Sequence, residues 1–122
     1  MAEYLPLHDD GDSITRAASA SITGGQLVRV SGSGTVAPVS AASSDWLGVA
    51  AFDASTGDNV TVFCSGVQRL TASGSITAGG TVEGAASGQV AAHTNGTNDF
   101  NIVGVALTTV TVGQVVEVKF VR

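Results

Sequence analysis

Hydrophobic and polar residues alternate over short stretches of this chain, and glycine-containing turns separate the stretches. Apolar side chains occupy every second position from Val60 to Val62 and again from Val116 to Phe120. A period of two places one face of a β-strand toward a core. No window of about eleven residues carries a helical period free of glycine, although the alanine-rich stretch Thr15 to Ser21 could be helical. The pattern therefore predicts an all-β protein.

The strand pattern occurs twice along the chain. The segment Ile22–Val28 reappears 54 residues later as Ile76–Val82, and Gly57–Val62 reappears 56 residues later as Gly113–Val118. A two-residue insertion near residues 93–98, in a loop of the second copy, accounts for the change in spacing. Two copies can close into a barrel or a sandwich, whereas a solenoid usually needs more repeats.

Each copy is predicted to contain four short strands, so the chain would hold about eight. We expect one β domain over residues 13–122, built as a small β-barrel or β-sandwich with internal repeats at about 22–67 and 76–122. An extended N-terminal arm, residues 1–12, precedes it and would either pack on its own barrel or reach a partner. A length of 122 residues suits a single domain with a modest core.

Charge is sparse in this sequence. Charged residues make up 12% of the chain, well under the roughly 25% of an ordinary soluble domain, so partners are expected to cover part of the surface. The five basic residues are scattered and the net charge is −5, which argues against nucleic acid as a partner. No apolar run has the length of a membrane span, and the first residues do not form a signal-peptide pattern.

The candidate metal ligands and thiol have simpler interpretations. The acidic residues Asp9, Asp10 and Asp12 are interpreted as a solvated turn, with calcium ligation as the alternative. A metal site made by His8, Asp9 and Asp10 is considered and set aside in favour of a solvated histidine. Cys64 ends an apolar run, which predicts a small buried hydrophobe rather than a reactive thiol. No metal or cofactor is predicted.

Catalytic groups are also scarce. His93 has no histidine, cysteine or carboxylate at a metal-like spacing, and no serine stands in a nucleophile-elbow motif. The glycine-rich segment Ser31–Gly34 lacks the lysine and the helix of a phosphate-binding loop, so a hairpin turn explains it better. Trp46 is expected to anchor the core or a subunit contact rather than to form a ligand platform. These observations predict a chain that is not an enzyme.

Several motifs follow one another in a set order: Gly11–Thr15, Ile22–Val28, Leu47–Ala50, Gly57–Val62, Ser65–Ala72 and Val103–Leu107. In this order and spacing the chain resembles the capsid decoration, or cement, proteins of tailed bacteriophages, small β proteins that bind the outside of an assembled head. The resemblance implies a β-tulip-like fold and a virion structural protein on the outer capsid surface, made in the host cytoplasm.

The resemblance also implies partners and contact residues. It implies a homotrimer at three-fold or quasi-three-fold positions of the shell, bridging neighbouring subunits of the major capsid protein. The arm would grip the capsid through Ala2, Glu3, Tyr4, Leu5, Pro6, Leu7 and His8. The alternative is a ligand- or glycan-binding β module on a virion or cell surface. That alternative predicts an exposed aromatic groove around Trp46.

Overall fold

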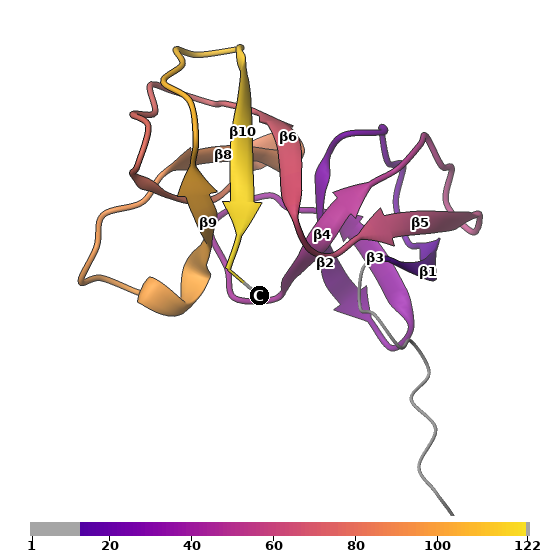
Figure 1. Ribbon diagram of the computed structural model, residues 1–122. Helices are drawn as coiled ribbons and strands as arrows, with labels where there is room; N and C mark the ends of the chain where they lie inside the picture. Colours follow the sequence, from indigo (N-terminus) through magenta and orange to yellow (C-terminus); the bar gives the residue numbers. More distant parts are fainter. Residues whose placement is uncertain (1–12, 122) are drawn as a thin grey trace, which may run out of the picture.

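The computed structural model describes residues 13–121, which form ten strands and two short 3₁₀ helices (Figure 1). The strands are β1 (Ser13–Ala18), β2 (Leu27–Gly32), β3 (Thr35–Pro38), β4 (Trp46–Ala50), β5 (Asn59–Phe63), β6 (Val67–Thr71), β7 (Thr81–Ala85), β8 (Gln89–Ala92), β9 (Ile102–Ala106) and β10 (Val115–Phe120). The helices are η1 (Ala86–Gly88) and η2 (Asp99–Asn101). The predicted all-β class is confirmed.

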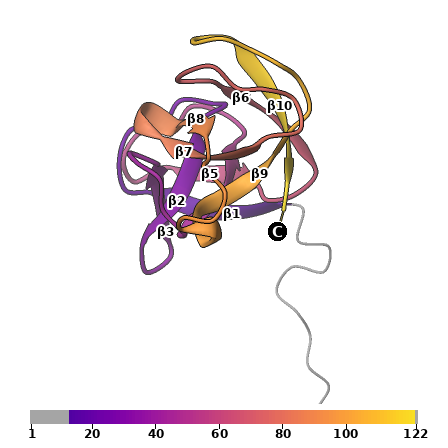
Figure 2. The ribbon, with the colours of Figure 1, turned by 90° about the vertical axis from the view of Figure 1, so that its left-hand side faces the viewer.

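Strands β1 to β5, here called the first unit, form a closed barrel in the order β1-β3-β2-β4-β5. β1 closes the barrel because it pairs antiparallel with β5 on one side and parallel with β3 on the other. Strands β6 to β10, the second unit, form a sheet in the order β6-β10-β9-β7-β8. The two units lie side by side in Figure 1, and the second lies in front of the first in Figure 2.

The two units have the same strand order when β6 is matched to β1 and each later strand to its counterpart. The pairing register agrees as well. The parallel partners Ala18 and Val36 of the first unit correspond to the isolated parallel bridge between Ala72 and Val90 in the second. Both units also contain an irregularity at the same point of the second strand, after Val28 and after Val82. The repeat in the sequence is therefore a repeat of three-dimensional structure.

Each unit contains five strands rather than the predicted four, because β1 and β6 were not expected from the pattern. Residues Thr15 to Ala18, which could have been helical from their alanine content, belong to β1. Five residue pairs join β1 to β5, from Ser13 with Phe63 to Ala17 with Asn59. Pairing with a neighbouring strand therefore overrides the weak local preference of this segment.

The turns of the two units repeat the same hydrogen bonds. The amide of Gly57 donates to the carbonyl of Ala18 at 2.8 Å, and the amide of Gly113 donates to the carbonyl of Ala72 at 2.8 Å. These glycines have φ angles of +92° and +83°, which residues other than glycine rarely adopt. The predicted tight turns before β5 and β10 are thus explained by the glycine at each.

Two hydrophobic clusters form the core. One belongs to the first unit alone and contains Ala18, Ile22, Val28, Val36, Ala50, Ala54, Val60 and Val62. The other fills the second unit and also includes Leu27, Val39, Trp46 and Val49 from the first. These four side chains project from the outer face of the first barrel and pack against the second unit. The two units therefore share a continuous apolar contact.

Candidate functional site

The predicted capsid-binding arm, from Ala2 to His8, lies outside the described residues. The same holds for the acidic residues Asp9, Asp10 and Asp12. The described surface, residues 13–121, is where a site can be sought. No group of histidine, cysteine and acidic residues in that part of the chain could hold a metal ion. No helix in it is long and apolar enough to span a membrane.

Trp46 lies in the core between the two units. The residue is 4% exposed, and its ring packs edge to face against the ring of Phe120, with the two ring centroids 5.3 Å apart. An indole that stacks on a sugar needs an exposed ring face. The structure therefore places Trp46 as a core anchor and shows no exposed aromatic groove around it.

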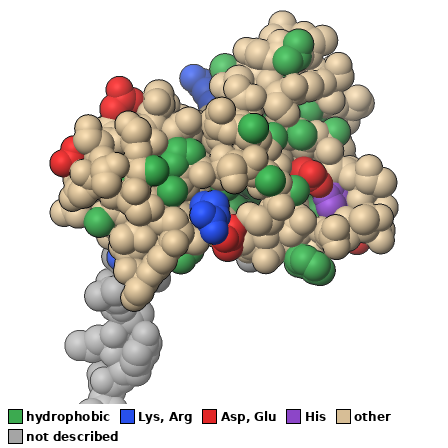
Figure 3. Space-filling model, turned by 180° about the vertical axis from the view of Figure 1, so that it is seen from behind, with side chains coloured by type: hydrophobic (Ala, Val, Ile, Leu, Met, Phe, Trp, Pro, Cys, Tyr) green, Lys and Arg blue, Asp and Glu red, His purple; other side chains and the backbone are tan. Residues whose placement is uncertain are grey.

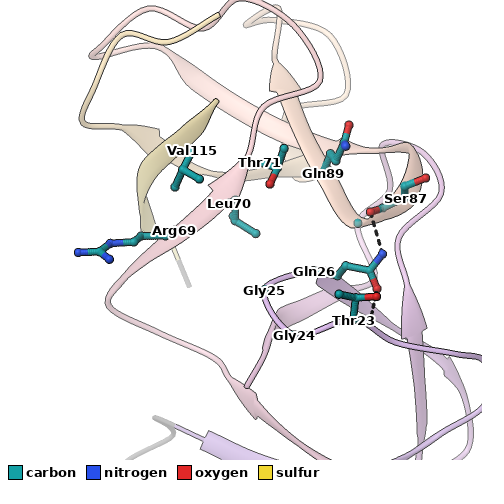
Figure 4. Close-up of a pocket in the computed structure, with 11 residues that line it drawn as sticks. Thr23, Gly24, Gly25, Gln26, Arg69, Leu70, Thr71, Ser87, Gln89 and Val115 are labelled. Atoms are coloured by element: carbon teal, nitrogen blue, oxygen red, sulfur yellow. Dashed lines mark hydrogen bonds between the residues drawn. The ribbon is translucent and has the colours of Figure 1, made fainter. Parts of the chain in front are cut away.

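A hollow of about 520 Å³ lies at the junction of the two units (Figure 4). Gln26 of the first unit spans the junction, because its side-chain amide donates to the carbonyl of Ser87 at 3.0 Å while its side-chain oxygen accepts from the amide of Thr23 at 2.8 Å. Arg69 is the charged residue of the lining, and its guanidinium points away from Gln26 (Figure 4). The hollow offers no acid–base pair, so we assign it no chemistry.

A smaller hollow of about 230 Å³ lies on the first unit. Ile14, Val30 and Leu47 line it with apolar side chains, and Arg16 lies at the same place. Val30 is 46% exposed, and Ile14 and Leu47 are only partly buried against the barrel core. We call Ile14, Val30 and Leu47 the first-unit patch.

Cys64 follows β5 and is half-buried against the same core cluster. Burial raises the pKa of its thiol, so the nucleophilic thiolate is disfavoured. The thiol donates a weak hydrogen bond to the carbonyl of Val62 at 3.5 Å. The geometry agrees with a packing role, although the side chain is less enclosed than the sequence predicted.

His93 lies between two carboxylates on the second unit, and we call Glu83, His93 and Asp99 the histidine clasp. Its Nδ1 lies 2.6 Å from Oε1 of Glu83, and its Nε2 lies 3.0 Å from Oδ1 of Asp99. The side chain of His93 is 2% exposed. The hydrogen bond with Asp99, aided by Glu83, raises the pKa of His93 against the opposing effect of burial.

The clasp holds the loop between β8 and β9 against β7. The amide of Gly96 donates to Oδ1 of Asp99 at 2.8 Å, and the hydroxyl of Thr81 lies 2.6 Å from Oδ1 of Asn95. Sequence spacing missed this cluster because Glu83 lies ten residues before His93, on the neighbouring strand, and Asp99 lies beyond the inserted loop. Strand pairing brings together groups that no local motif connects.

Much of the face seen in Figure 3 is uncharged, and several large apolar side chains lie on the described surface. They are Val30, Phe52, Phe63, Val67, Phe100, Leu107, Val112, Val115 and Val121. Phe100, in η2 of the loop held by the clasp, is 70% exposed. Such surfaces are typical of proteins that function in contact with others.

Comparison with known proteins adds a family. A family model described as phage cement protein matches residues 8–120. Among solved structures, the head fiber gp8.5 N base of bacteriophage phi29 is similar to this chain with a TM-score of 0.66 and 20% sequence identity, covering 88% of this chain and 92% of that one. At this identity the likeness shows the fold alone. No curated protein sequence matches the chain.

Proposed function

Since the chain belongs to the phage cement protein family and is a structural protein of the virion capsid, we propose that it binds the outer surface of the head and stabilises it. The family match over residues 8–120 is the observation that carries this proposal. The described surface supports it, because charged residues are sparse and several large apolar side chains are exposed. The proposed action is binding without chemistry.

The partner we propose is the major capsid protein. In this proposal a homotrimer of the chain bridges neighbouring subunits of that capsid protein. Many modest interfaces add up on a shell, since each bound copy raises the effective concentration of the next contact. A specific interface of this kind buries about 1,000 Å² or more. Exposed apolar side chains such as Phe52, Val67 and Leu107 provide surface for such contacts.

The arm is proposed to grip the capsid through the residues from Ala2 to His8. Tyr4, Leu5 and Leu7 are apolar residues close together in sequence, ahead of an acidic stretch. An extended segment of this kind can bind in a groove or along a strand edge of another protein. Twelve residues extend to roughly 40 Å, which is long enough to reach a neighbouring subunit.

The test is co-sedimentation of the purified chain with empty heads of the parent phage, combined with the melting temperature of the decorated heads. We expect the full chain to pellet with the heads and to raise their melting temperature. A chain without residues 1–11 should do neither. Replacing Tyr4, Leu5 and Leu7 by serine keeps the length of the arm and should weaken pelleting, whereas Glu3→Gln should retain it. A full chain that stays in the supernatant would contradict the proposal.

The glycan-binding alternative has no support from the described residues. It requires exposed aromatic rings around Trp46, and that residue is buried.

A further inference from the structure

The contact between the two units suggests a contact between two chains. Within one chain, Leu27 and Val39 of the first unit cover Gly84 of the second. A Cβ atom added at Gly84 would lie 3.4 Å from Cγ2 of Val39 and 3.5 Å from Cδ2 of Leu27. Trp46 covers Phe120 in the same contact. One face of the second unit is therefore buried by the outer face of the first.

The repeat identifies the equivalent face on the first unit. The offset of 54 residues relates Gly84 to Val30, and the offset of 56 residues relates Phe120 to Cys64 and Val103 to Leu47. Val103 is fully buried, whereas Leu47 is half-buried and Val30 is 46% exposed. The first-unit patch is thus the counterpart of a covered face, and no part of residues 13–121 covers it to the same extent.

The repeat also identifies the face of the second unit that corresponds to the covering one. Leu27 corresponds to Thr81, Val39 to His93 and Trp46 to Ile102. The strand registers confirm these matches, since Leu27 pairs with Val49 as Thr81 pairs with Val105. This face carries the histidine clasp and, two residues before Ile102, the exposed ring of Phe100.

We propose that a second copy of this chain covers the first-unit patch with the loop face of its second unit, Phe100 and Ile102 packing against Ile14, Val30 and Leu47. The contact is head to tail, because the two chains use different surfaces. It repeats between chains the arrangement seen between units within the chain. Contacts of this type close into rings when the rotation between successive copies permits. The inference rests on the proposed homotrimer and specifies its interface.

Charge supports this pairing of faces. Arg16 lies beside the patch, and no carboxylate of the described chain is within ion-pair distance of it. The histidine clasp carries two carboxylates and one imidazole, so it is negative by one charge when His93 is protonated. Opposite charges at the rim of an interface favour the correct register over alternatives. The clasp also fixes the loop that carries Phe100, which lowers the ordering cost of association.

The test is the molecular mass in solution of single variants by light scattering. We expect the wild-type chain to have about three times the 12.1 kDa monomer mass. Val30→Glu, which damages the patch, and Phe100→Ser, which damages the loop face, should each reduce the mass to that of a monomer. Val112→Glu is the matched control, because Val112 is 70% exposed and lies in the turn at the opposite end of the second unit from η2 (Figure 1). This control should keep the wild-type mass.

Mixing the two interface variants makes the test specific for a head-to-tail contact. Val30→Glu retains an intact loop face and Phe100→Ser retains an intact patch, so the mixture should form one good contact and reach the mass of two chains. A mixture that stays monomeric would overturn the proposal. A wild-type chain that is monomeric would also overturn it. Variants that keep the wild-type mass would do the same, because a second copy would then not be what covers the patch.

Pelleting with heads separates this inference from the proposed function. A monomeric wild-type chain that still pellets would refute the head-to-tail contact and leave the capsid role intact. A wild-type trimer that dissociates in both variants but ignores heads would support the contact and refute the capsid role.

Discussion

Adding a methyl group at Gly104 tests how closely β9 and β10 approach. Gly104 is buried in β9, and a Cβ atom placed there would lie 2.2 Å from the carbonyl oxygen of Lys119 and 2.8 Å from Cγ1 of Val118. Gly48 occupies the corresponding position of β4, where a Cβ atom would lie 2.1 Å from the carbonyl oxygen of Phe63. Both units therefore need glycine at this point of the fourth strand.

The cost of Gly104→Ala follows from the separation it imposes. Ordinary contact begins near 3.4 Å, so β9 and β10 must move apart by about 1.2 Å. The hydrogen bonds that flank this site join Leu107 to Glu117 at 2.8 Å and Val121 to Val103 at 3.1 Å. Losing both costs about 1–3 kcal/mol, and overpacking costs about 1–3 kcal/mol. We expect the free energy of unfolding to fall by about 2–6 kcal/mol.

Urea unfolding followed by the fluorescence of Trp46 measures this loss. Trp46 is the single tryptophan and lies in the core that β9 and β10 help to form. Gly74→Ala is the matched control, because no atom lies within 4 Å of a Cβ atom at Gly74 and its φ angle is not in the left-handed region. The control should be unchanged or more stable by up to about 1 kcal/mol. A loss below about 1 kcal/mol for Gly104→Ala would refute the argument from close approach.

Two further changes test the core and the histidine clasp. Trp46→Ala should lower the free energy of unfolding by about 3–5 kcal/mol, because it removes a buried ring that packs on Phe120. Thermal unfolding followed by circular dichroism measures this loss. An unaltered melting temperature would contradict the shared core. The pKa of His93 is raised above 6.5 and that of Asp99 is lowered below 3.8, so the clasp should protect the Gly96 amide from hydrogen exchange most strongly between these values. The contribution of His93 is complete below pH 6.5 and is lost as the pH rises through its raised pKa, while that of Asp99 is lost as the pH falls through its lowered pKa. Protection that, after correction for intrinsic exchange, is the same at every pH and unchanged by His93→Ala would contradict the clasp.

The sequence predicted the fold class because its alternation and its glycines reflect local constraints. The alternation at residues 60–62 and 116–120 corresponds to β5 and β10, and the glycines before them lie in tight turns. β1 and β6 could not be found in this way. Arg16 of β1 corresponds to Leu70 of β6, a buried core residue, so the two strands place different side chains at the same position. Only the pairing partners reveal that they are equivalent.

The contact residues were harder to predict than the strands. Trp46 was expected in the core or in a subunit contact, and only the packing of the two units places it against Phe120. His93 lacked any local partner in the sequence and gained two carboxylates through strand pairing and the inserted loop. The role of the arm, from Ala2 to His8, stays a prediction, because it lies outside the described residues.

The differences between the two copies say more about contacts than their similarities do. Positions with the same residue in both units, such as the turn glycines, maintain a fold that both need. Positions that differ in polarity lie where the units have different neighbours. Leu27 is buried against the second unit, whereas its counterpart Thr81 hydrogen-bonds to Asn95 in the loop between β8 and β9. Val39 and His93 differ for the same reason. A duplicated chain cannot bury both copies of an outer face internally, so one copy stays on the surface of the chain. In this chain the second copy of that face is polar but carries an exposed phenylalanine, and the patch that would receive it has remained apolar.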